Sequence, residues 1–145
     1  MNKIYSILLI SLMTIVMASC DKEDDLNEIF EGGRFHVTGL TYNGKKVNSG
    51  VKEFYESDGT YYLVFSGHTF SGVLHAGTQI SGTWAADGSS RQFSMTFTGQ
   101  DGIESSTQLC TQVYSVLKHA TSYKGDVNYI MIYQDSDSYV TLAKQ

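Results

Sequence analysis

The feature of this sequence that most limits its fold is a series of short stretches in which apolar and polar residues alternate. The clearest is RQFSMTFTG at 91–99, where Phe93, Met95 and Phe97 alternate with serine and threonine. A period of two places these apolar side chains on one face of a strand and leaves the other face to water. Because the chain contains no proline, Gly, Asn and Asp must make the turns, and Asn43-Gly44 suits a tight type I′ hairpin.

Further strands are expected wherever similar stretches lie between turn residues, at 34–40, 61–66, 69–74, 79–85, 127–133 and 138–143. Residues 45–59 are ambiguous, because they fit either a helical turn or a short strand. Alternation with one polar face is typical of antiparallel sheets. The pattern therefore predicts a mainly β fold.

One segment, SSTQLCTQVYSVLKHA, breaks the alternation and predicts a helix over 107–120. Its apolar residues recur at helical spacing: Leu109, Val113, Val116, Leu117 and Ala120. Ser105 or Ser106 can supply the N-cap oxygen. Cys110 lies beside Leu109 and Val113, and we expect it to be a small buried residue, with an intermolecular disulfide or a reactive thiol as the alternative. We therefore expect an α+β fold, an antiparallel sheet or partly open barrel with one helix in the C-terminal half.

The N-terminus has the pattern of a secretory signal peptide. Lys3 is followed by an uncharged, apolar stretch over 4–19, which is shorter than the roughly 20 residues of a membrane-spanning helix. The residues MASC that end at Cys20 resemble the lipobox of bacterial lipoproteins. That resemblance implies cleavage after residue 19 and acylation of Cys20. The alternative is an ordinary cleavage site followed by an incidental cysteine.

Acidic residues follow directly after this cysteine. The run CDKEDD, at 20–25, predicts a solvated tether over 20–31. It also resembles the short signal that sends lipoproteins of Bacteroidetes to the cell surface. We therefore expect an outer-membrane lipoprotein exposed at the surface, with the periplasmic face as the alternative.

The remaining residues, 32–145, are expected to form a single domain. Basic and acidic residues are almost equal in number over this range. The domain therefore lacks the basic footprint of a nucleic-acid-binding protein.

Several short motifs resemble the META domain, typified by the heat-shock lipoprotein HslJ. The matching residues are the Asn-Gly-Lys turn at 43–45, Phe70-Ser71-Gly72, the segment SGTWAADG at 81–88, Cys110, Leu117, Tyr123 and Gly125-Asp126. Phe35 stands where that family prefers tryptophan, and its Cys-Asn pair is missing, so a disulfide of some members cannot form. The chain equally resembles small lipocalin-like lipoproteins of unknown function from Bacteroidetes. Both resemblances imply a β-domain, and neither implies an agreed activity.

No local motif indicates catalysis, a metal or a cofactor. The segment GLTYNGKK lacks the Ser or Thr of a P-loop, and no Gly-x-Ser-x-Gly elbow is present. His68 and His75 are seven residues apart, an odd step that places them on opposite sides of a strand. Asp135 and Asp137 lack the later residues of a calcium loop, and a turn is the expected structure.

Aromatic residues are the remaining candidates for a binding site: Tyr61, Tyr62, Trp84 and Tyr129. Flat rings with polar tips suit sugar or peptide recognition. Tyrosine also favours strands without any binding role, and Trp84 shares a face with Ile80 that suits the core. We therefore expect a non-catalytic binding or accessory module with a glycan, peptide or protein partner. The alternative is an envelope hydrolase or glycan-processing enzyme.

Overall fold

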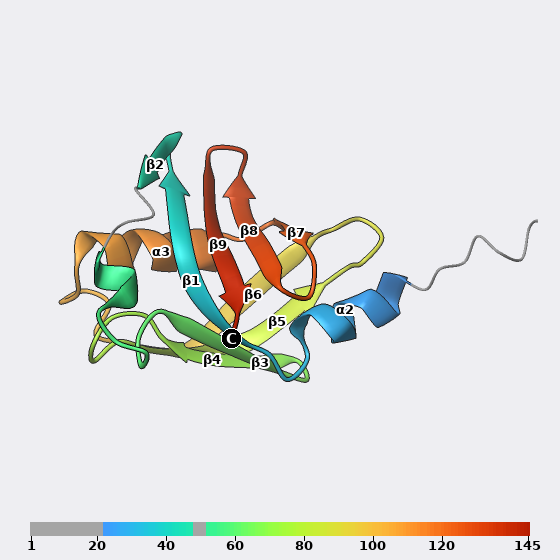
Figure 1. Ribbon diagram of the computed structural model, residues 1–145, viewed down its shortest axis with the longest axis horizontal. Helices are drawn as coiled ribbons and strands as arrows, with labels where there is room; N and C mark the ends of the chain where they lie inside the picture. The colour runs from blue at the N-terminus through green and yellow to red at the C-terminus, as the bar shows by residue number, and fades with distance from the viewer. Residues whose placement is uncertain (1–21, 48–51) are drawn as a thin grey trace, which may run out of the picture.

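The computed structural model describes residues 22–47 and 52–145, so the predicted signal peptide and Cys20 lie outside the described residues. The elements, shown in Figure 1, follow in the order α2 (Lys22–Phe30), β1 (Arg34–Tyr42), β2 (Lys45–Val47), the 3-10 helix η2 (Lys52–Tyr55), β3 (Tyr62–Ser66), β4 (Thr69–Val73), β5 (Gln79–Ala86), β6 (Phe93–Asp101), α3 (Gln108–Lys118), β7 (Ser122–Gly125), β8 (Tyr129–Asp135) and β9 (Ser138–Lys144). None of the described helices is long and apolar enough to cross a membrane.

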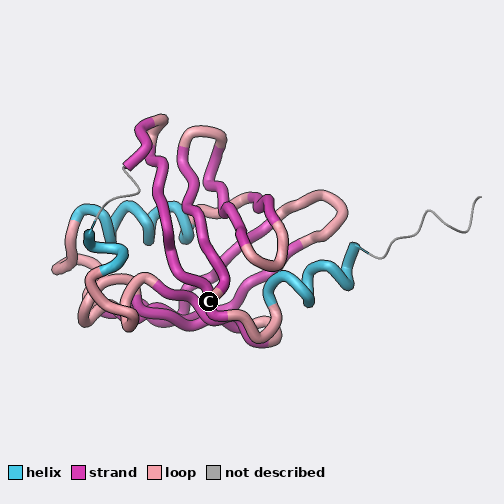
Figure 2. Tube along the Cα trace, viewed as in Figure 1, coloured by secondary structure: helices cyan, strands magenta, loops and turns pink. Residues whose placement is uncertain are grey.

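The strands form one antiparallel sheet that curls into a partly open barrel (Figure 2). Its order is β6-β5-β4-β3-β1-β9-β8-β7, with β2 paired to β1. The two ends of the sheet meet where Gln92 pairs with Ser122 and the Phe93 N–H donates to the Thr121 carbonyl at 3.0 Å. The predicted fold class, mainly β with one helix in the C-terminal half, is therefore confirmed.

The predicted hairpin at Asn43-Gly44 is present. Tyr42 pairs with Lys45, and both turn residues have positive φ, 50° and 76°. Those angles are what a type I′ turn requires, and asparagine and glycine tolerate them better than other residues.

Strict alternation fails in β1, where a bulge shifts the register between Val37 and Gly39. Before the bulge the side chains of Phe35 and Val37 point into the core, and after it Leu40 does. A bulge adds one residue to one strand and so reverses which positions face inward. Gly39 lies at this point because a Cβ there would come within 2.7 Å of the Thr141 hydroxyl.

Helix α3 packs on the inner side of β1, β9 and β8 and also contacts β6. Its buried residues are Leu109, Cys110, Val113, Tyr114, Val116 and Leu117. The N-cap is Thr107, whose hydroxyl accepts the Cys110 N–H, and not Ser105 or Ser106 as predicted. Both serine hydroxyls instead donate to carbonyls three residues earlier in the chain.

The predicted solvated tether is wrong over its second half. Residues 22–30 form α2, and the side chains of Ile29 and Phe30 are buried in the core. The Phe30 ring lies within 5.4 Å, centroid to centroid, of four other aromatic rings, those of Phe65, Trp84, Phe93 and Tyr123. The acidic residues at 21–25 led to the prediction of a tether. The apolar residues Ile29 and Phe30 follow shortly after them, just before β1, and pack into the barrel. The folded domain therefore begins before residue 32.

Candidate functional site

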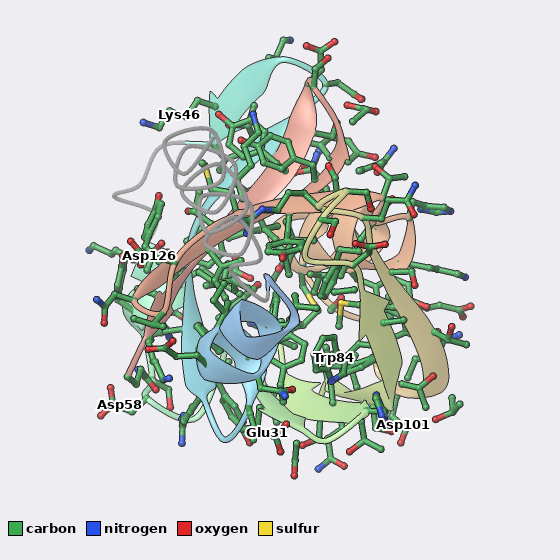
Figure 3. The ribbon with its side chains drawn as sticks, turned by 90° about the vertical axis from the view of Figure 1, so that its right-hand side faces the viewer. Glu31, Lys46, Asp58, Trp84, Asp101 and Asp126 are labelled. Atoms are coloured by element: carbon green, nitrogen blue, oxygen red, sulfur yellow. The ribbon has the colours of Figure 1, made fainter. Side chains whose placement is uncertain are left out.

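The four aromatic residues proposed from the sequence divide into two pairs. Tyr61 and Trp84 are buried inside the barrel, whereas Tyr62 is half-buried and Tyr129 is 44% exposed on its outer surface. In Figure 3 the Trp84 side chain points into the interior, among the strands. The four side chains therefore do not form one site.

The two interior residues are held by contacts within the fold. The Trp84 indole packs on Phe30 and lies 5.5 Å from the Phe65 ring. The Tyr61 hydroxyl donates to the Glu53 carboxylate. Burial, with this hydrogen bond, raises the pKa of the Tyr61 phenol well above its ordinary value. Both side chains occupy the positions of core residues.

The two outer residues lie in one row across four strands. Tyr62 of β3 pairs with His36 of β1, His36 pairs with Ala143 of β9, and Ala143 pairs with Tyr129 of β8. Directly paired residues project from the same face of a sheet. Neighbouring strands are about 4.8 Å apart, so Tyr129 and His36 are about 10 Å apart across the small Ala143 side chain.

His36 and Tyr55, which are not among the four candidates proposed from the sequence, belong to the same surface. The His36 ring is only 8% exposed, and the Tyr55 ring, itself 58% exposed, lies over it with 5.3 Å between the centroids. Neither ring nitrogen of His36 makes a well-aligned hydrogen bond with a described residue, although the Phe54 backbone partly favours its protonated form. Burial lowers the pKa of His36 overall. The ambiguous pattern at 45–59 gave no sign that Tyr55 would cover β1.

More tyrosines continue this surface toward the β8–β9 hairpin. The ring centroids of Tyr133 and Tyr139 are 4.8 Å apart with the rings tilted by 32°, and the Lys124 ammonium lies 5.4 Å from the centre of the Tyr133 ring. At the other side, the Arg34 guanidinium lies 4.0 Å from the centre of the Tyr62 ring. We call the outer surface of β3, β1, β9 and β8 the tyrosine face; it carries His36, Tyr55, Tyr62, Tyr129, Tyr133 and Tyr139. In Figure 1, α3 lies behind β1 and β9, on their inner side, and it also contacts β8.

A second group of polar side chains meets at Glu53. Its Oε1 accepts hydrogen bonds from the hydroxyls of Tyr61 and Thr107 and lies 3.4 Å from Nδ1 of His75. We call these four residues the Glu53 cluster. It joins η2, the residue before β3, the β4–β5 turn and the N-cap of α3. The two histidines were expected on opposite sides of one strand, but both lie outside β4, one beyond each end: His68 in the β3–β4 turn and His75 in the β4–β5 turn. Among the described residues, no group of three His, Cys, Asp or Glu is arranged to hold a metal ion.

One protein family matches most of the sequence. The family described as "Domain of unknown function (DUF4847)" matches residues 21–144. The chain belongs to the DUF4847 family. The crystal structure of another DUF4847 family protein, from Bacteroides vulgatus ATCC 8482, superposes with a TM-score of 0.65 at 24% sequence identity, covering 81% of this chain and 96% of that one. That similarity supports the fold.

The DUF4847 family carries no assigned activity. No curated protein matches this chain significantly. The predicted resemblance to small β proteins of unknown function from Bacteroidetes fits this family and its Bacteroides member. Neither comparison shows membership of the META family.

Proposed function

We propose that this DUF4847 protein is a lipid-anchored, non-catalytic binding module of the cell envelope that holds a carbohydrate on its tyrosine face. The binding role is inferred from the pairing of the strands. Their register places Tyr62, His36 and Tyr129 in one row on the same face of the sheet. Tyr55 and Tyr129 are the large hydrophobic side chains most open to solvent on the described surface. Side chains on strands are held more firmly than those on loops, which reduces the entropy lost on binding.

The backbone arrangement favours a carbohydrate over an extended peptide at this face. In the described part of the sheet β1 and β9 each have a neighbouring strand on both sides, so neither is an edge strand to which a peptide could add. Recognition must therefore come from side chains. Tyrosine rings offer flat apolar surfaces with hydroxyl groups at their tips, which suits the apolar faces and hydroxyls of a sugar.

Binding to an array of neutral oligosaccharides tests this role. Replacing both Tyr55 and Tyr129 with Ala should weaken binding by about tenfold or more, since each aromatic contact contributes roughly 0.5–1.5 kcal/mol. Thr83→Ala is the matched control, because Thr83 is exposed on β5, outside the tyrosine face. Undiminished binding by the double variant, or binding to a peptide library alone, would contradict the carbohydrate role.

The lipid anchor is proposed from the lipobox-like residues that end at Cys20. One acyl chain binds a membrane only marginally, whereas two or more hold stably at about 0.8 kcal/mol per buried methylene. Cys20→Ala should abolish incorporation of labelled palmitate and leave the protein unprocessed or soluble. Palmitate labelling of that variant would exclude Cys20 as the anchor.

Exposure at the outer-membrane surface is proposed from the acids after Cys20. An externally added protease should cleave the protein on intact cells. Replacing the acids at 21–25 with asparagine should protect it by leaving it at the periplasmic face. If the external protease failed to cleave the unchanged protein on intact cells, the protein would lie at the periplasmic face instead.

The alternative function, an envelope hydrolase or glycan-processing enzyme, finds its best support in the Glu53 cluster. A carboxylate and an imidazole from distant segments meet there at 3.4 Å. The same carboxylate oxygen, however, also accepts hydrogen bonds from the Tyr61 and Thr107 hydroxyls. Because a general base must have a lone pair free for the proton that it takes up, this arrangement suits a structural role better. Hydrolysis of a glycan that His75→Ala abolishes without loss of stability would favour the enzyme.

A further inference from the structure

Helix α2 is fixed to the barrel at its C-terminal end. Phe30 is fully buried, and the Glu31 carboxylate accepts the Gly67 N–H at 3.0 Å. The Gly32 N–H donates to the Phe65 carbonyl at 3.1 Å, and the Phe65 N–H donates to the Gly33 carbonyl at 3.3 Å. The side chain of Phe30 and the backbone bonds after it therefore prevent α2 from pivoting freely on β3.

The helix begins close to the proposed anchor. Lys22, its first residue, is two positions after Cys20. Nine helical residues are about 14 Å long, whereas nine extended residues can reach about 30 Å. Over residues 22–30 the chain is therefore shorter than an extended tether, and its direction is that of α2.

Helix α2 lies at one end of the molecule (Figure 1). A hollow of about 340 Å³ beside the helix is lined by Leu26 and Asn27 of α2, by His68 of the β3–β4 turn, and by Asp87 and Gly88 of the β5–β6 loop. In Figure 1, α2 lies at the right, and the start of α3 with the loop before it lies at the left. We call these two regions the α2 end and the α3 end.

The α2 end also has a charge that suits a position near lipid without insertion. Helix α2 contains the acids Glu23, Asp24, Asp25 and Glu28. Negatively charged phospholipid headgroups repel such a segment. This repulsion opposes insertion of α2 into the bilayer.

We propose that the α2 end of the barrel faces the phospholipid bilayer and that α2 acts as a rigid spacer, leaving the α3 end directed away from the membrane. This inference rests on the proposed lipid anchor. The occupant of the α2 end is the membrane surface itself, because only Asp21 lies between Cys20 and the first residue of the helix.

Fluorescence quenching of the acylated full chain in phospholipid vesicles tests the orientation. Ser89→Cys places a label on the β5–β6 loop at the α2 end, and Glu104→Cys places one at the α3 end; both residues are exposed. Cys110 is fully buried and Cys20 is blocked by lipid, so neither takes the label in the folded protein. A nitroxide on the lipid headgroups should quench the label at position 89 several-fold more than the label at position 104.

A flexible insertion supplies the control. About 20 Gly-Ser residues placed between Asp21 and Lys22 add on the order of 25 Å of reach and should remove the difference between the two labels. Equal quenching at both positions in the acylated protein, or a difference that survives the insertion, would overturn the orientation and leave the anchor intact. Failure of the unchanged chain to incorporate palmitate would instead overturn the anchor first, and the orientation with it.

Discussion

The ring of Phe30 lies 4.9 Å, centroid to centroid, from the indole of Trp84, although one residue belongs to the acidic N-terminal segment and the other to β5. The same ring lies 5.4 Å from Tyr123 on β7 and 5.4 Å from Phe93 on β6. These are the strands at the two ends of the sheet. Phe30 therefore fills the barrel where its ends come together.

Removing this ring should destabilise the whole domain. Phe30→Ala is expected to lower the free energy of unfolding by about 3–5 kcal/mol, the range for deleting a buried aromatic side chain. Urea unfolding of the purified protein measures this loss of stability. Glu28→Ala, on an exposed position of the same helix, should have little effect. Equal, small losses in both variants would mean that α2 does not contribute to the fold.

Helix α3 should be structural through its inner side. Leu117 is fully buried, so Leu117→Ala should cost about 2–5 kcal/mol. Lys118→Ala should cost much less, since that side chain is exposed and lies 5.6 Å from the Tyr114 ring. Denaturant unfolding distinguishes the two. A neutral Leu117→Ala would show that this side of α3 does not close the barrel.

The Glu53 cluster should couple η2 to the start of α3. Thr107→Ala removes both the N-cap bond to Cys110 and the bond to Glu53, and should cost about 1–2 kcal/mol. Combining it with Glu53→Ala in a double-mutant cycle should give a coupling energy of about 0.5–3 kcal/mol. Gln108→Ala, at the exposed first position of the helix, is the control. If the stability losses of the two single variants simply added in the double variant, Thr107 and Glu53 would not be coupled.

Acid should weaken the fold through His36. Burial lowers the pKa of this ring in the folded state, whereas the unfolded chain takes up the proton near its ordinary value of about 6.5. The unfolded state then binds more protons, so stability falls as pH drops below about 6.5 toward the folded-state pKa.

Denaturant midpoints at about pH 7.5 and about pH 5.5, on either side of the ordinary histidine pKa, measure this loss. His36→Gln should reduce the difference between the two midpoints, because the amide does not titrate. His68→Gln, at an exposed turn position, should leave the difference unchanged. An unaltered difference in the His36 variant would assign the acid sensitivity to other groups.

Local patterns in the sequence determined much of the fold. The alternation of Phe93, Met95 and Phe97 predicted β6, Asn43-Gly44 predicted the first hairpin, and the spacing of Leu109, Val113 and Leu117 predicted α3. Each depends on residues close together in the chain, whose backbone and burial preferences agree with the final structure. Strand β7 was missed because its four residues, SYKG, are too few and too polar to show a period.

The sequence alone could not assemble either candidate site. Tyr62 and Tyr129 were named from their chemistry, but only strand pairing aligned them with His36, and only the path of η2 laid Tyr55 over that ring. The bulge after Val37 and the insertion of Phe30 into the barrel likewise depend on partners far away in the chain. Such contacts form once burial of apolar surface outweighs the entropy of closing long loops, and that balance belongs to the whole fold and not to any local stretch.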